Sequence, residues 1–144
     1  MNAPLLVRLF VIAFILRLLA ALALSFSGLL FAGASADSVT YHRMGLEIAT
    51  ALSYNQPGPR SSWVDDAWFR LIGHIYYWIA PEPFILQFLT AVLGSLAVVM
   101  TAQMAWAAYR DIRVAYFAGW LVAVFPSFVY FNALLLKDAA ALFL

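Results

Sequence analysis

The sequence predicts an all-α, polytopic transmembrane helical bundle with an amphipathic external first loop. Three apolar stretches carry this prediction, because each is close to or above the ~20 residues that a helix needs to cross ~30 Å of hydrocarbon: Leu9–Phe31, Phe84–Ala108 and Val114–Phe131. The composition agrees, since 66% of the residues are hydrophobic and 10% are charged, whereas about a quarter are charged in ordinary soluble domains. We therefore expect an integral, multi-pass membrane protein.

The charge balance argues against a nucleic-acid partner. Eight Lys and Arg residues stand against seven Asp and Glu residues, so the formal net charge is +1, and the sequence has no basic run that could release counterions from a phosphate backbone. Cysteine is absent, which removes disulfides, thiolate nucleophiles and cysteine-ligated zinc. Most charged residues lie between the apolar stretches, so we expect any chemistry to take place at the membrane surface.

The expected boundaries make residues 1–144 the N-terminal part of one membrane domain. Transmembrane helices are predicted at about 8–32, 84–109 and 113–126, with the start of a fourth at about 130–144. The third helix ends or kinks at Pro126-Ser127, because proline lacks an N–H group and clashes with the preceding turn. The fourth stretch is too short to cross a bilayer and has no stop signal, so we expect the chain to be truncated at its C-terminus, inside a helix.

The first span carries Arg17 near its middle. A central arginine costs ~2.5–3.5 kcal/mol on the insertion scale, whereas each of the many Leu, Ile, Val and Phe residues around it contributes ~0.3–0.6 kcal/mol in favour of insertion. Insertion is therefore predicted. The alternative is a secretory signal that would be cleaved after residue 36, because Ala34-Ser35-Ala36 has the A-x-A form of a cleavage site.

Arginine residues near the helix ends predict the orientation. Arg110 and Arg113 flank the short turn between the second and third spans, and Arg8 precedes the first span. The positive-inside rule then places the N-terminus and that turn in the cytoplasm, and the loop over residues 33–83 outside.

The external loop is predicted to contain two amphipathic helices, at about 38–52 and 63–80, that lie along the bilayer surface. The residues between them, 54–61, include Pro57 and Pro59, which no helix interior tolerates. The second helix carries one polar stripe, which we interpret as a solvated face rather than a ligand site: Asp66, Arg70 and His74.

Two ionisable neighbours, Lys137 and Asp138, fall in the expected fourth helix. Ionisable residues at membrane depth are costly and normally face a cavity or a partner, which makes this pair a functional candidate. The alternative is a self-neutralising pair at the interface, in which the Lys137 side chain extends toward water.

The order of these features resembles the GT-C glycosyltransferases, above all the bacterial relatives of protein O-mannosyltransferases and of lipid A sugar transferases. The shared features are a first span that ends before an external acid, an aromatic residue soon after it, a long amphipathic loop, a second span with Gln and Gly, and a third span that ends in proline: Asp37, Tyr41-His42, Gln87, Gly94 and Pro126. The resemblance implies a cell-envelope enzyme of the bacterial inner (plasma) membrane. Such an enzyme moves a sugar from a polyprenyl-phosphate donor to an acceptor at the external face, with membrane lipid as its other partner.

The resemblance also assigns chemistry to the first external acid, and the matching residue is Asp37. A carboxylate there would accept the proton of the acceptor hydroxyl as it attacks the anomeric carbon, with inversion, while positive groups stabilise the departing lipid phosphate. Ser38 stands where some members have a second acid, so a second acid would come from Glu47 or Asp138. A divalent metal ion is left open as a cofactor, with Asp37 and Asp138 as its candidate ligands.

Three further residues are candidates for substrate contacts: Lys137, Arg43 and His42. Lys137 or Arg43 would contact the donor phosphate. His42 would assist proton transfer or ligate a metal, although a lone histidine at this position is also typical of a structural interfacial residue. The adjacent acids Asp65 and Asp66 point to different sides of a helix and are interpreted as helix-start charges.

Two other classes of protein stay open. A transporter or flippase fragment would show Gly- or Pro-broken helices near mid-membrane and repeated halves. A non-catalytic membrane assembly subunit would show packing faces of small residues, of which the second span has a weak version: Ala91, Gly94, Ser95 and Ala97. The long amphipathic loop favours the transferase, because neither alternative needs it.

Overall fold

The computed structural model describes residues 3–27, 36–57 and 66–133, and its secondary structure over these ranges is helical. Its helices, in chain order, are α1 (Ala3–Phe26), α2 (Ala36–Ser53), α3 (Asp66–Trp78), α4 (Pro83–Tyr109), α5 (Ile112–Val124) and α6 (Pro126–Ala133). No strand occurs in the described ranges. The all-α prediction is therefore confirmed for this part of the chain.

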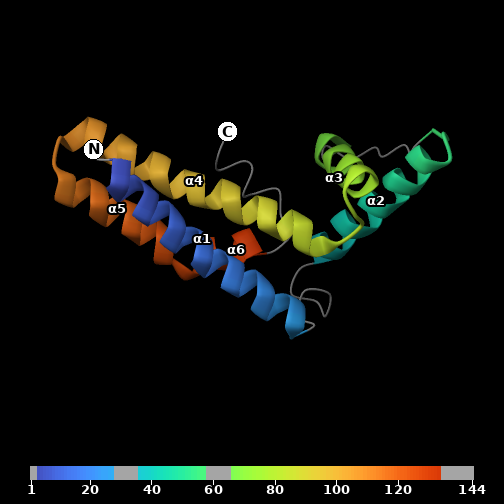
Figure 1. Ribbon diagram of the computed structural model, residues 1–144, viewed down its shortest axis with the longest axis horizontal. Helices are drawn as coiled ribbons and strands as arrows, with labels where there is room; N and C mark the ends of the chain where they lie inside the picture. Colours follow the sequence, from blue (N-terminus) through green and yellow to red (C-terminus); the bar gives the residue numbers. More distant parts are fainter. Residues whose placement is uncertain (1–2, 28–35, 58–65, 134–144) are drawn as a thin grey trace.

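The helices form two groups (Figure 1). The long helices α1 and α4 pack with α5 and α6 into an elongated bundle, while α2 and α3 pair with each other as a hairpin at one end of it. The turn between α4 and α5 lies at the opposite end, near the N-terminus. We refer to these as the hairpin end and the turn end of the bundle.

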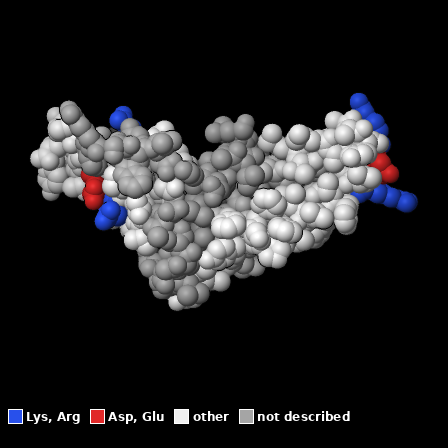
Figure 2. Space-filling model, turned by 180° about the vertical axis from the view of Figure 1, so that it is seen from behind, with Lys and Arg blue, Asp and Glu red and all other residues white. Residues whose placement is uncertain are grey.

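Length and composition identify the membrane-spanning elements. Helices α1 and α4 have 24 and 27 residues and are apolar enough to cross a bilayer, and the pair α5 and α6, bent by 52° at its break, passes the same test as one broken span. Among the described residues on the face seen in Figure 2, the charged side chains gather at the two ends, and none lies on the described surface between them. These features support an integral membrane protein.

Several helix boundaries differ from the expected ones. Helix α1 runs from Ala3 to Phe26 rather than from about residue 8 to about residue 32. Helix α6 begins at Pro126, one residue after α5 ends, whereas the sequence predicted that the third helix ends or kinks at Pro126-Ser127 and that the next helix begins at about 130. Proline suits the first turn of a helix because its fixed φ is helical and its missing N–H is not needed there. Residues 134–144, with Lys137 and Asp138, lie outside the described part.

Small residues let the spanning helices approach one another closely, as is typical of membrane helix packing. The cluster between α1, α4 and α5 combines fully buried alanines with two larger aliphatic residues: Leu9, Ala13, Val98, Ala102 and Ala123. Larger apolar side chains such as Val11, Leu19 and Phe117 are exposed on the outside of the bundle, where lipid would surround them.

The hairpin is held by a crossing at two glycines. A Cβ atom on Gly45 would collide with the side chain of Ile72, and a Cβ atom on Gly73 would collide with the side chain of Ile48. The two helices therefore touch backbone to side chain. Their shared core contains buried aromatic residues and continues to α4 and α1: Tyr41, Phe69, Tyr76, Leu86 and Leu24.

The turn end is defined by two local signals. Arg110 ends α4 in the left-handed conformation, with φ of 55°, and its N–H bonds to the Trp106 carbonyl. Asp111 then starts α5, because its side chain accepts a hydrogen bond of 2.7 Å from the Arg113 N–H. Two long helices are thus connected by a minimal turn.

Candidate functional site

Pro126 leaves a gap in the hydrogen bonding between α5 and α6. It has no N–H to offer the carbonyl four residues earlier, that of Val122. Arg17 of α1 supplies donors instead: its Nη2 lies 3.4 Å from the Val122 carbonyl, and its Nη1 lies 3.5 Å from the Ala123 carbonyl and 3.2 Å from that of Ala13. The positive guanidinium thus sits at the negative end of the α5 dipole.

Arg17 is buried inside the bundle, with 1% of its surface exposed. At ~1.5 Å per residue it lies about 20 Å along α1 from the turn end, well inside the hydrocarbon depth. No acidic side chain among the described residues forms an ion pair with it. A guanidinium stays protonated in proteins, so the bundle holds a positive charge whose partners in the described chain are backbone carbonyls.

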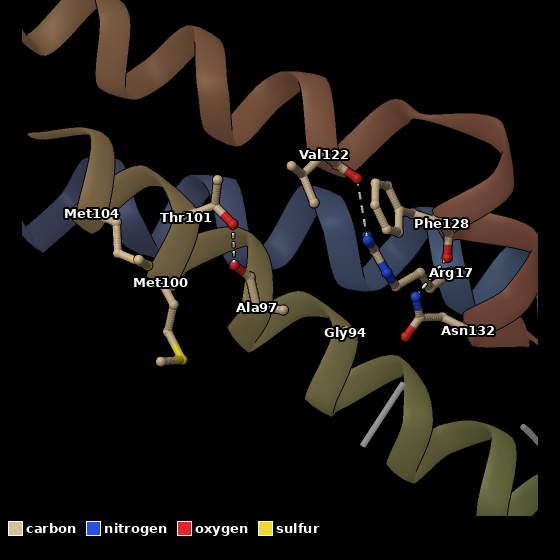
Figure 3. A pocket seen from close by; sticks show the side chains of 9 residues that line it. All are labelled: Arg17, Gly94, Ala97, Met100, Thr101, Met104, Val122, Phe128 and Asn132. Atoms are coloured by element: carbon tan, nitrogen blue, oxygen red, sulfur yellow. Dashed lines mark hydrogen bonds between the residues drawn. The ribbon is translucent and has the colours of Figure 1, made fainter. Parts of the chain in front are cut away.

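A cavity of about 160 Å³ lies beside Arg17 and is lined by residues of α1, α4, α5 and α6 (Figure 3). Two of its lining residues each contain a fully buried polar atom, Nε of Arg17 and Oδ1 of Asn132, that has no hydrogen-bond partner within the described residues. Both lie against Gly94 of α4: a Cβ atom there would collide with Asn132 Oδ1 and would stand 2.9 Å from Arg17 Nε. Because Gly94 has no side chain, Asn132 and Arg17 pack directly against the α4 backbone and fill the place that a side chain would take.

Polar side chains of α4 connect α6 to the rest of the bundle. Gln87 Nε2 donates to the Ala133 carbonyl at 2.9 Å, and Gln87 Oε1 accepts from Ser25 Oγ of α1 at 2.9 Å. Thr90 Oγ1 donates to the Asn132 carbonyl at 2.8 Å. These bonds satisfy the last carbonyls of the described α6 from the side.

The hairpin contains a second polar contact, between His42 Nδ1 of α2 and the Tyr76 hydroxyl of α3, at 2.8 Å. Burial lowers the pKa of His42, and the nearby Glu82 carboxylate opposes that shift. Burial raises the pKa of Tyr76 well above its ordinary value, and Glu82 adds to this shift. At neutral pH both groups are therefore uncharged, and the imidazole tautomer decides which of them donates.

Several residues singled out from the sequence lie on the hairpin. Asp37 is in the first turn of α2, where the positive end of the helix dipole favours a carboxylate; its side chain is outside the described part. Arg43 and Glu47 form an i,i+4 pair at 3.9 Å, with 70% and 49% of their side chains exposed, which contributes little to stability. His42 instead faces α3 through Tyr76.

The remaining candidates are not brought together in the described chain. Lys137 and Asp138 lie outside it, as does Asp65, and the Asp66 side chain is not described. Arg70 and His74 are exposed on α3. The prediction that Asp37 and Asp138 are metal ligands concerns side chains outside the described part. The described side chains contain no group of three that could hold a metal ion.

Sequence reasoning missed the contact between Arg17 and the broken helix. Arg17 was weighed as a cost of insertion, and Pro126 as a kink. The contact could have been predicted from the depth of the two groups along their helices. At ~1.5 Å per residue, Arg17 lies about 20 Å from the turn end and the Val122 carbonyl lies about 15 Å from it. A buried donor and an orphaned acceptor at similar depth are natural partners.

A second, apolar cavity of about 580 Å³ forms an open groove between α1 and the α5–α6 break. Its walls include Leu16, Ala20 and Leu24 of α1, with Val129 and Tyr130 of α6. Leu24 also packs against the hairpin core. Through Leu24 the groove therefore adjoins the hairpin core.

Comparisons with protein-family models, curated proteins and solved structures give no significant match to this chain. The fold and the site alone define the class: an α-helical membrane protein with a buried arginine and a small cavity beside a broken helix. Beyond that class, the function is a matter of proposal.

Proposed function

We propose that the protein is a membrane glycosyltransferase of the GT-C type that takes a sugar from a polyprenyl-phosphate donor. The observation that carries the proposal is the continuity between the groove and the hairpin, because Leu24 lines the groove and also packs against the hairpin core. A polyprenyl chain is long and apolar, and it would bury apolar surface in this groove. Its phosphate would then emerge near the end of α1, from which the chain leads to Asp37.

The proposed chemistry assigns Asp37 as the base. Its carboxylate accepts the proton of an acceptor hydroxyl, whose oxygen attacks the anomeric carbon. The bond from that carbon to the phosphate oxygen breaks, the configuration inverts, and the lipid phosphate leaves with the electron pair. Arg43 or Lys137 would stabilise the charge on the leaving phosphate, and His42 would assist proton transfer.

The test is Asp37→Asn in the complete protein, reconstituted with a polyprenyl-phosphate sugar and an acceptor extract. Loss of a general base should lower transfer by ~10²–10⁴-fold, while the amide keeps the size and capping ability of the residue. Asp111→Asn is the matched control, because it makes the same change at the start of α5, at the far end of the bundle. Near-normal transfer by Asp37→Asn would contradict a role as general base and would assign Asp37 to helix capping alone.

One observation favours a second candidate function, a transporter or flippase. The bent helix pair of α5 and α6 breaks beside the buried Arg17, and broken helices are typical of transporters. Movement of a fluorescent lipid phosphate across proteoliposomes distinguishes the two. A transferase would move no lipid and would depend on Asp37, whereas a flippase would move lipid and tolerate Asp37→Asn.

A further inference from the structure

The apolar faces of the two hairpin helices pack against each other. Their shared core contains five side chains that are at most 7% exposed: Tyr41, Ile48, Phe69, Ile72 and Tyr76. The sequence predicted two amphipathic helices that lie along the bilayer surface, and such helices normally bury their apolar faces in lipid. In the structure those faces are already covered by protein, so contact between the hairpin and lipid has to come from the faces that stay exposed.

The exposed face of α3 is rich in apolar and aromatic side chains. Leu71, His74 and Trp78 follow one another at helical spacing and form one exposed stripe. Leu71 is 45% exposed, Tyr77 is 44% exposed and Trp78 is 76% exposed, and Ile79, directly after the helix, is 67% exposed. Tyrosine and tryptophan combine an apolar ring with a polar group, which makes them typical of the boundary between membrane and water.

The exposed face of α2 has the opposite character. Its described positions carry hydroxyl and charged side chains: Thr40, Arg43, Glu47, Thr50 and Ser53. Val39, in the first turn, is the one large apolar residue exposed on the described part of this helix. The hairpin therefore has a polar side formed by α2 and an apolar, aromatic side formed by α3.

The connection to α4 fixes the depth of α3. With 27 residues, α4 is about 40 Å long, which is close to the ~40–45 Å of a bilayer with its headgroup layers. Its first turn therefore lies in a headgroup layer. Leu86, near that turn, belongs to the buried core of the hairpin, and four residues separate the end of α3 from Pro83. Figure 1 also shows α3 on the side of the hairpin that faces the bundle, whereas the C-terminal half of α2 extends away from it.

We propose that the exposed face of α3 is a membrane-contact surface, immersed in the headgroup layer of a phospholipid bilayer, while the exposed face of α2 lies in water. The inference does not depend on the proposed transferase activity. Lipid fits this face because α3 is held at headgroup depth beside a spanning helix. The headgroup layer, unlike hydrocarbon, also accommodates the polar residues Arg70 and His74 on the same side of the helix.

The test measures how often a spin label collides with oxygen, which concentrates in lipid, and with a water-soluble nickel chelate. The protein has no cysteine, so single labels are attached in phosphatidylcholine vesicles at Leu71→Cys and His74→Cys on α3. Glu47→Cys on α2 is the matched control, because the Glu47 side chain is 49% exposed and Leu71 is 45% exposed. Phe117→Cys, at a position 68% exposed on the outside of the bundle, gives the value for lipid.

We expect the ratio of oxygen to nickel collisions at both α3 positions to be several-fold higher than at Glu47→Cys, and to approach the value at Phe117→Cys. A ratio as low as that at Glu47→Cys would place both sides of the hairpin in water and would overturn the proposal. Low collision rates with both reagents would show that protein covers α3, and a high ratio at Glu47→Cys would show that the hairpin has no water-facing side. Either result would also overturn it. Should one α3 variant fail to fold, the other reports on the same stripe.

Discussion

Arg17 on α1 donates a hydrogen bond of 3.4 Å to the carbonyl of Val122 on α5, the group that Pro126 leaves without its helical partner. A charged side chain on one span thus completes the backbone of another. Such rescue by a neighbouring helix is how membrane proteins tolerate proline within a span. The break between α5 and α6 and the buried arginine therefore depend on each other.

This dependence predicts coupling between Arg17→Met and Pro126→Ala. Alanine at 126 would supply an N–H for the Val122 carbonyl, so that carbonyl would no longer need the hydrogen bond from Arg17. We expect Arg17→Met to be more destabilising with Pro126 present than with alanine in its place, with an interaction energy of about 0.5–3 kcal/mol. The measurement is a double-mutant cycle of unfolding free energies in detergent micelles. Strict additivity of the two changes would contradict the mutual dependence.

The second prediction concerns the crossing of the hairpin. Gly45→Ala places a methyl group onto Ile72, and the two helices must separate to accept it. Overpacking of this kind typically costs ~1–3 kcal/mol, and here it should lower the thermal midpoint of the hairpin. Ala51→Gly, a change of the same size further along α2, is the control, and should cost no more than the ~0.5–1 kcal/mol of glycine in a helix.

The pH dependence of the hairpin should follow His42. Because burial lowers the pKa of His42 in the folded state, the unfolded chain binds the proton more readily. The stabilising contribution is therefore complete above pH 6.5, the ordinary value, and is lost as the pH falls through the folded pKa. Thermal melts between about pH 5 and 8 should show a falling midpoint on the acid side. His42→Gln should flatten this slope, and an unchanged slope would assign it to another group.

Much of the fold could be predicted from the sequence, because span length and helical periodicity are local properties. The apolar stretches predicted α1 and α4, and the amphipathic patterns indicated helices where α2 and α3 lie. The Arg17 site could not be predicted, since it needs residues from α1, α4, α5 and α6 at one depth. The same holds for the His42–Tyr76 contact, which depends on how α3 folds back on α2.

The last prediction tests the orientation of the bundle. Arg8, Arg110 and Arg113 all lie at the turn end, so the positive-inside rule places that end in the cytoplasm and the hairpin outside. The chain has no cysteine, so single introduced cysteines report cleanly. Ser53→Cys on the hairpin should react with an impermeant maleimide in intact cells, whereas Ile112→Cys at the start of α5 should react after the membrane is opened. Both positions are partly or fully exposed, so a difference in labelling reports sidedness rather than burial. The reverse pattern would put Asp37 on the cytoplasmic side and would remove the external acceptor from the proposed reaction.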